Sequence, residues 1–219
     1  MTYEFRFSGL RQYADMFLEG TLLTLQLSAL AMVIGLVIGI IGALIKTQGP
    51  GWARRAVDGY VEIIRNTPLL VQCFFIFFGL PSTGISLTAW QAALVALSVN
   101  LGAYATEIVR AGIESIHRGQ IEAGLSLGLT RLELFRYVIL FPAVKNVYPA
   151  LASQFILLLL GSSVVSQISA PELFYTGAFI DSRSFLSFEV YAVITVIYLA
   201  LSLSFRLLFN LIDTLAFRR

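Results

Sequence analysis

Three stretches of the chain lack any charged residue over lengths that the core of a soluble protein does not need. They cover residues 21–45, 66–106 and 146–170. A helix rises ~1.5 Å per residue, so about 20 apolar residues cross the ~30 Å hydrocarbon core of a bilayer. The first and the third stretch are therefore each long enough for one crossing. The second is long enough for two, with a turn predicted at 81–84, which reads Pro-Ser-Thr-Gly.

The composition excludes an ordinary soluble fold. Only 13% of the residues are charged, 58% are hydrophobic and the mean hydropathy is +0.82, whereas soluble domains carry roughly 25% charged residues. The apolar runs are continuous and rich in Leu, Ile, Ala and Gly rather than alternating, which favours helices over an outer-membrane barrel. A net charge of +2 gives no indication of a nucleic-acid partner.

We predict an all-α membrane protein that forms a single domain over 1–219. It has about five transmembrane helices, expected at about 17–46, 60–80, 87–110, 138–165 and 188–212. Pro68 should break or kink the beginning of the second span, which leaves backbone groups that need partners. Gly35 and Gly39 permit close helix packing in the first span. Arg206, in the fifth, must snorkel or face protein.

The distribution of basic residues predicts the orientation. Twelve of the fifteen fall on one side of the predicted spans: Lys46, Arg54, Arg55, Arg65, Arg110, Arg118, Arg131, Arg136, Lys145, Arg206, Arg218 and Arg219. Arg6, Arg11 and Arg183 fall on the other side. Cytoplasmic loops are enriched in Lys and Arg, so we expect the N-terminus outside and the C-terminus in the cytoplasm of a multi-pass protein.

No catalytic or metal-binding residue is predicted. Residues 42–47 superficially resemble a phosphate loop, but the Gly-Lys-Ser/Thr ending is missing, so the chain has no ATPase motif of its own. His117 is the sole histidine and Cys73 the sole cysteine, and no carboxylate cluster accompanies them to make a metal site. We expect an inert, buried thiol at Cys73 and an exposed cytoplasmic turn at His117.

Several polar residues fall within or near the ends of the predicted spans, where lipid would penalise them. They should face the bundle interior, either as hydrogen-bonding contacts between helices or as the lining of a pathway. The candidate lining comprises Asn100, Tyr104, Gln154, Ser162, Ser163 and Gln72. Glu107 and Arg110, three residues apart, are expected to form a local ion pair rather than a substrate site.

The segment 111–136 between the third and fourth spans is the largest predicted cytoplasmic loop. It alternates apolar and charged residues at helical spacing, with Leu125, Leu129 and Leu132 at helical intervals. Gly119, Gly124 and Gly128 leave places where another backbone could approach. Two interpretations remain open on this pattern, a docking surface for a partner and an amphipathic helix on lipid head groups.

Within this loop, the run Glu122-Ala-Gly-Leu-Ser-Leu-Gly128, followed by Val138-Ile-Leu-Phe-Pro142, resembles the EAA loop of permeases in binding-protein-dependent ABC importers. The third motif position is Gly124 instead of alanine. Phe141 occupies the usual proline position, with Pro142 one residue later. The segments IRNTPLLVQCFFIFFGLP at 64–81 and GAYATEIVRAGIESIHRGQ at 102–120 are similar to the polar amino-acid branch. The resemblance extends from about Gly20 to the last span.

The resemblance implies a type I importer permease fold in the inner membrane of a bacterium. It implies ATPase-coupling roles for Glu122, Ala123, Gly124 and Gly128 in a short coupling helix. The implied partners are a cytoplasmic ABC ATPase dimer that hydrolyses the ATP, a second identical or homologous permease chain, an extracytoplasmic amino-acid-binding protein and membrane lipid. No cofactor would be bound by this chain. Many relatives with basic substrates carry an acidic residue in the fourth span near residues 160–163, where this sequence reads Leu-Gly-Ser-Ser, so the anchor for a cationic side chain is missing.

Two other functions compete with that of a permease for polar amino acids. An ion-coupled secondary transporter would usually show inverted repeats, paired broken helices and carboxylates within the membrane, which this sequence does not show clearly. A non-transporting scaffold would bind soluble partners through the segment 111–136. The polar residues in the third and fourth spans disfavour a scaffold.

Overall fold

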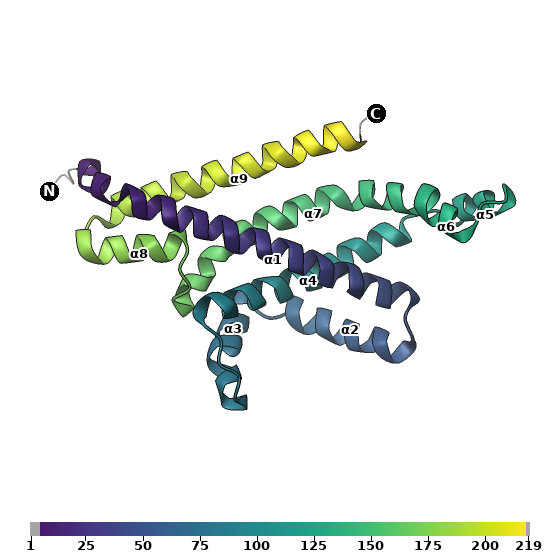
Figure 1. The fold of residues 1–219 in the computed structure, drawn as a ribbon, viewed down its shortest axis with the longest axis horizontal. Coiled ribbons are helices and arrows are strands. Elements are labelled where there is room, and N and C mark those ends of the chain that lie inside the picture. Colours follow the sequence, from purple (N-terminus) through teal and green to yellow (C-terminus); the bar gives the residue numbers. More distant parts are fainter. Residues whose placement is uncertain (1–4, 218–219) are drawn as a thin grey trace.

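The computed structural model describes residues 5–217, and every regular element within them is a helix. The elements in chain order are η1 Phe7–Tyr13, α1 Ala14–Gln48, α2 Gly51–Arg65, α3 Leu69–Phe74, η2 Phe75–Gly79, η3 Leu80–Thr83, α4 Ala89–Glu114, α5 Arg118–Ser126, α6 Arg131–Glu133, η4 Leu134–Leu140, α7 Phe141–Gly161, η5 Ser162–Ile168, α8 Leu173–Ser184 and α9 Ser187–Phe217. Figure 1 shows the long helices running roughly side by side, with α5 and α6 extending beyond one end. The predicted all-α class is confirmed.

Four helical stretches in the described residues are long and apolar enough to cross a membrane, namely Phe7–Gln48, Ala89–Glu114, Arg131–Ile168 and Ser187–Phe217. A fifth span exists if the bent pair Gly51–Arg65 and Leu69–Thr83 counts as one. This range agrees with the prediction of about five helices. Arg218 and Arg219, which the basic-residue count included, lie outside the described residues.

The α1–α4 pair forms the centre of the bundle. Leu27 and Ala31 of α1 and Ala96 of α4 are fully buried in one apolar cluster, together with Cys73. An added Cβ at Gly35 would lie 2.8 Å from Cβ of Leu101, which is closer than side chains approach. The predicted close packing at the α1 glycines is therefore confirmed, and so is the buried position of the thiol.

The chain bends through 109° between α2 and α3. Pro68 has no backbone N–H and takes an extended conformation at the N-cap of α3, which ends the helical hydrogen-bonding pattern there. Helix α2 already begins at Gly51, so the expected span 60–80 contains the end of one helix and the beginning of another. Figure 1 shows α3 and the following turns leaving the bundle at a steep angle.

Gln72 supplies the partners that this break requires. Its Nε2 donates to the carbonyl oxygen of Ile64 over 2.8 Å and to that of Thr67 over 3.1 Å. Both carbonyls lie close to the break, where the regular helical bonding is interrupted. A buried amide side chain thus replaces the missing helical donors, as the bilayer environment demands.

The fourth span accommodates Pro142 without breaking. The residues before it, Leu134–Leu140, form a π-helix, and α7 begins at Phe141 with the proline in its first turn. Proline has no N–H for either an i−4 or an i−5 hydrogen bond, and Pro142 lies where the pattern already changes from π-helix to α-helix. The displaced proline therefore shapes the beginning of the span and leaves the helix continuous to Gly161.

A buried carboxylate, which sequence reasoning did not single out, joins the last elements. Glu172 accepts hydrogen bonds from the backbone N–H of Phe174 at 2.9 Å and of Tyr175 at 2.6 Å, and from the hydroxyl of Tyr198 at 2.7 Å. Burial raises the pKa of the Glu172 carboxyl, and these three hydrogen bonds oppose that rise. The side chain caps α8 and ties it to α9.

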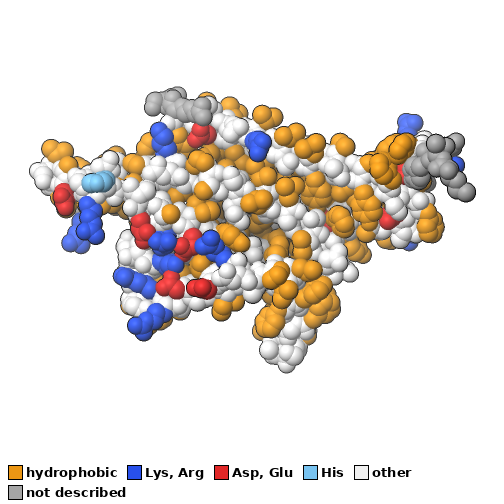
Figure 2. Space-filling view, turned by 180° about the vertical axis from the view of Figure 1, so that it is seen from behind, with side chains coloured by type: hydrophobic (Ala, Val, Ile, Leu, Met, Phe, Trp, Pro, Cys, Tyr) orange, Lys and Arg blue, Asp and Glu red, His pale blue; other side chains and the backbone are white. Residues whose placement is uncertain are grey.

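Large apolar side chains are exposed along much of the outer surface. On α9, large hydrophobic residues such as Val196, Leu199 and Leu207 are exposed, which suits contact with lipid or with another apolar helix. Figure 2 shows charged side chains gathered mainly at the end of the molecule that contains α2, with hydrophobic groups spread over the rest of that face. The bundle therefore has one strongly charged end.

Candidate functional site

A hollow lies between α3, α4 and α7, and we call it the mid-bundle hollow. It has a volume of about 250 Å³. Its lining residues are Leu69, Leu97, Asn100, Leu101, Tyr104, Gln154, Leu157, Leu158 and Gly161. Three of the predicted lining residues, Asn100, Tyr104 and Gln154, therefore meet around one space. Of the described residues that line it, none is charged.

Gln72 stands behind the wall of this hollow rather than in it. Nδ2 of Asn100 donates to Oε1 of Gln72 over 3.0 Å, and Gln72 is itself buried. The hydrogen bond uses the carbonyl oxygen of the Gln72 amide, while the NH₂ group of the same amide donates to the Ile64 carbonyl at the α2–α3 break. Gln72 thus positions Asn100.

The two serines lie elsewhere. Ser162 is buried in η5 and donates to the carbonyl of Leu159 over 2.7 Å. Ser163 donates to the carbonyl of Leu160 over 2.8 Å. Neither serine is among the residues that line the mid-bundle hollow. Their hydroxyls instead satisfy carbonyls where α7 changes to a 3₁₀-helix, which is a local structural use.

An ion cluster joins the ends of α1, α2 and α4. Nζ of Lys46 lies 2.6 Å from a carboxylate oxygen of Glu107 and 2.6 Å from one of Asp58. Arg110 pairs with Glu107 at 2.7 Å and also with Glu114, so the predicted Glu107–Arg110 pair is confirmed. The Lys46 contacts could have been suspected, because Lys46 and Glu107 each follow a long uncharged run.

Beside this cluster is a larger space, which we call the charged hollow. Its volume is about 650 Å³. It is lined by Lys46, Asp58, Val61, Glu62, Arg65, Asn66, Tyr104 and Glu107. Tyr104 borders both this space and the mid-bundle hollow, so the two adjoin at its side chain.

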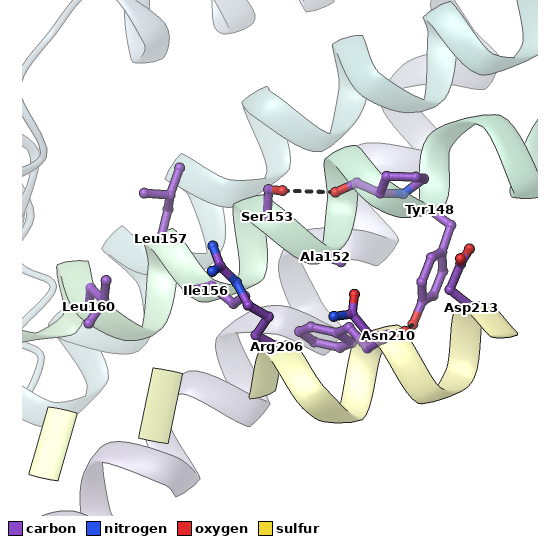
Figure 3. Close-up of a pocket in the computed structure, with 11 residues that line it drawn as sticks. Tyr148, Ala152, Ser153, Ile156, Leu157, Leu160, Arg206, Asn210 and Asp213 are labelled. Carbon is purple, nitrogen blue, oxygen red and sulfur yellow. Dashed lines mark hydrogen bonds between the residues drawn. The ribbon is translucent and has the colours of Figure 1, made fainter. Parts of the chain in front are cut away.

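A third groove runs between α7 and α9. Figure 3 shows Arg206, Asn210 and Asp213 projecting from α9 toward α7, where Tyr148 and Ser153 lie. The hydroxyl of Tyr148 donates to the carbonyl of Phe209 over 2.9 Å and holds the two helices together. Arg206 therefore faces another helix, which is one of the two placements predicted for it.

The segment 111–136 is a folded tip rather than one long helix. Helix α5 ends after Ser126, and a new helix begins at Arg131, where the Thr130 and Glu133 side chains form a reciprocal capping box. Glu122 and Ala123 are exposed on α5. Leu127 is 83% exposed and Leu132 is 75% exposed, so apolar groups point away from the protein at this tip. His117 is exposed at the beginning of α5, as predicted.

Gly124 and Gly128, the two glycines of the motif, determine the shape of the tip. Gly128 has φ +80°, and the Leu129 N–H bonds back to the carbonyl of Gly124 over 3.1 Å, which is a Schellman ending. Gly124 is buried, and a Cβ added there would lie 2.5 Å from Cδ1 of Leu134. Gly124 therefore packs α5 against η4 within the chain and is not open to a partner's backbone.

Comparison with known proteins places the chain among transport proteins. The sequence profile described as binding-protein-dependent transport system inner membrane component matches residues 35–217. The glutamine transport system permease protein GlnP of Escherichia coli (strain K12) is 37% identical over 203 residues, 91% of this chain and 92% of that protein. The probable glutamine ABC transporter permease protein GlnM of Bacillus subtilis (strain 168) is 34% identical over 189 residues, 86% of this chain and 88% of that protein.

Solved structures show the same fold. A crystal structure of an amino acid ABC transporter with histidines has a chain that superposes with a TM-score of 0.89 and 38% identity, covering 97% of this chain and 99% of the other. An inward-facing structure of the MetNI methionine ABC transporter gives a TM-score of 0.76 at 22% identity, covering 94% and 98%. The second likeness is one of fold alone.

Proposed function

The chain belongs to the binding-protein-dependent transport system inner membrane components and is a permease subunit of an ABC importer, and we propose that its substrate is a neutral polar amino acid of the glutamine type. Family membership removes the secondary transporter and the scaffold as competing functions. It also implies an ATPase and a binding protein as partners. The inner membrane is the site of action.

The lining of the mid-bundle hollow is the observation that carries the proposed substrate class. Asn100, Gln154 and Tyr104 offer amide and hydroxyl groups, which both donate and accept hydrogen bonds. A substrate amide satisfies such groups, whereas a charged side chain would need an opposite charge that this lining lacks. The volume of about 250 Å³ is below the ~300–1,000 Å³ of sites for drug-sized ligands, as a single amino acid requires.

The tip at α5 is the proposed coupling element. Glu122 and Ala123 are exposed, and Leu127 and Leu132 present apolar surface beyond the bundle. The short helix α5 ends just before Gly128 and the long helix of the fourth span begins at Arg131, so α5 and this first turn make a compact knob that suits a groove on a soluble ATPase. An amphipathic helix lying on lipid would instead continue its apolar stripe along one helical face.

The assembly we propose contains two permease chains, identical or homologous, two ATPase subunits and an extracytoplasmic binding protein. The exposed apolar side chains of α9 support an apolar partner, either lipid or the second permease. The basic-residue distribution supports a cytoplasmic position for the charged end and for α5. The ATPase subunits bind and hydrolyse ATP, and this chain converts their closure into helix movement.

Reconstitution of the complete complex tests the function. Proteoliposomes containing this permease, its ATPase and its binding protein should accumulate labelled glutamine only when ATP is supplied. Unlabelled glutamine and asparagine should compete better than arginine, glutamate or leucine. Uptake without the ATPase, or stronger competition by arginine than by glutamine, would overturn the proposal.

A further inference from the structure

The groove between α4 and α7 continues beyond the mid-bundle hollow toward the charged end. There it widens into a space of about 650 Å³, which we call the end hollow. This space is lined by Arg65, Glu107, Ile108, Arg110, Ala111, Gly112, Ser115, Asn146, Val147 and Ala150. On α4, Tyr104 of the first hollow and Ile108 of the second are one helical turn apart, and so are Gln154 and Ala150 on α7. The two spaces are therefore consecutive stretches of one groove.

Arg65 and Tyr104 meet where these spaces join. The guanidinium carbon of Arg65 lies 5.2 Å from the centroid of the Tyr104 ring, within the range of a cation–π contact. Tyr104 lines the mid-bundle hollow and the charged hollow. Arg65 lines the charged hollow and the end hollow. One contact between two side chains thus separates the neutral space from the two spaces at the charged end.

Arg65 is well placed to leave this contact. It is the last residue of α2 and directly precedes the bend at Asn66, and its side chain is exposed. Glu107, the acid that borders the same two hollows, already pairs with Lys46 and Arg110. The guanidinium of Arg65 is held by an aromatic ring face. A carboxylate that reached it would accept two charge-assisted hydrogen bonds from the guanidinium, which are stronger than a cation–π contact at an exposed site.

We propose that Arg65 and Tyr104 form a gate between the mid-bundle hollow and the charged end, and that Arg65 opens it by binding the α-carboxylate of the passing amino acid. This inference rests on the proposed function and adds to it the part of the substrate that is recognised at the gate. The neutral lining of the mid-bundle hollow contacts the substrate side chain. Arg65 contacts the carboxylate, which every amino acid carries, so the gate is selective for the class and not for one member.

Downhill efflux from proteoliposomes that hold the complete complex tests the gate. Vesicles are loaded with labelled glutamine and given neither ATP nor binding protein. Arg65→Gln and Tyr104→Leu should raise efflux roughly two- to fivefold, which corresponds to the loss of one cation–π contact at an exposed site. Arg65→Lys keeps a cation and Tyr104→Phe keeps a ring face, so efflux from each should stay well below that from Arg65→Gln and Tyr104→Leu, while Tyr104→Phe also removes a hydroxyl from the mid-bundle hollow. Arg55→Gln, which removes an exposed charge from the same helix, is the matched control.

The carboxylate role is tested in the two open variants. Tyr104→Leu retains Arg65 and should release glutamine severalfold faster than the glutamine derivative whose α-carboxylate is replaced by an amide. Arg65→Gln should release the two compounds at equal rates. If both variants release glutamine and the amide derivative in the same ratio of rates, the carboxylate role is overturned. The gate is overturned if efflux from Arg65→Gln equals that of the wild-type complex, or if Tyr104→Phe and Tyr104→Leu leak equally.

A failure of the gate can be distinguished from a failure of the proposed function. The gate is wrong if wild-type complex performs ATP-driven glutamine uptake while efflux from Arg65→Gln and from Tyr104→Leu equals that from Arg55→Gln. The proposed function is wrong if wild-type complex shows no such uptake. Co-elution of each variant with its ATPase in detergent establishes that the complex is assembled before efflux is measured.

Discussion

Asn100 donates a hydrogen bond to Gln72 across 3.0 Å, and the same Gln72 side chain holds the carbonyls at the break between α2 and α3. One amide therefore couples the wall of the mid-bundle hollow to the bend at Pro68. A change in the bend angle would therefore act on Gln72 and, through this hydrogen bond, on Asn100. This connection gives the transporter a physical route from helix movement to the shape of the hollow.

Gln72→Leu should lower the free energy of unfolding more than the small change in side-chain volume would. The change removes the donor to the Ile64 and Thr67 carbonyls and the acceptor for Asn100, and unsatisfied buried groups cost about 1–3 kcal/mol. Thermal unfolding in lipid nanodiscs measures the loss. Gln48→Leu, at an exposed position near the end of α1, is the control. Equal unfolding temperatures for the two variants would contradict the role assigned to Gln72.

Glu172 should give the wild-type protein a pH-dependent stability that Glu172→Gln lacks. Burial raises the pKa of this carboxyl in the folded state, so the folded state binds more protons than the unfolded state. The stability that Glu172 contributes is then fully present below the pKa of the unfolded state and is lost as pH rises through the pKa of the folded state. Unfolding temperatures of both proteins from about pH 4 to about pH 8 check this, because the unfolded Glu pKa is near ~4.3. Unfolding temperatures of the two proteins that change in parallel with pH would contradict this role of Glu172.

Gly128→Val should uncouple hydrolysis from uptake. Gly128 has φ +80°, where a β-branched residue costs roughly 1–3 kcal/mol and would change the path of the chain after α5. Gly128→Asn is the matched variant, because asparagine tolerates this conformation. The ratio of glutamine transported to ATP hydrolysed is measured in proteoliposomes. The valine variant should lower the ratio and the asparagine variant should retain it, with equal membrane insertion of both. A normal ratio with valine would count against docking at the α5 tip.

Lys46 and Glu107 should show strong energetic coupling. A double-mutant cycle with Lys46→Met and Glu107→Gln should give a coupling energy of about 1–3 kcal/mol. Both side chains are largely shielded from solvent, at 15% and 19% exposure. The cycle of Lys46→Met with Asp58→Asn should give less, since the Asp58 side chain is 55% exposed. Chemical denaturation in detergent provides the free energies. Coupling that is as large for Asp58 as for Glu107 would contradict this ranking.

The local sequence pattern was sufficient for several features of the fold. The uncharged runs predicted the helical class and the range of spans, and Pro68 predicted the break that the structure shows. The glycine pair at 35 and 39 predicted close packing of α1, and Glu107 with Arg110 predicted an ion pair within α4. Each of these predictions depends on residues within a few turns of one another.

The site was only partly accessible to the same reasoning. Asn100, Tyr104 and Gln154 were selected because lipid penalises polar groups, and they share one hollow. Ser162 and Ser163 were selected by the same rule and turn to nearby carbonyls instead. Glu172 was overlooked because it falls outside the predicted spans, and its burial arises from packing against α9 and Tyr198.

Sequence alone determined where this chain can cross a bilayer, because a helix must present about 20 apolar residues to hydrocarbon whatever surrounds it. Tertiary structure decided which polar side chains meet. The contacts of Arg65 with Tyr104, of Lys46 with Glu107 and of Gln72 with Asn100 each join residues from different helices. Their distances depend on how helices cross and bend in three dimensions, and the periodicity of a single helix carries no information about that arrangement.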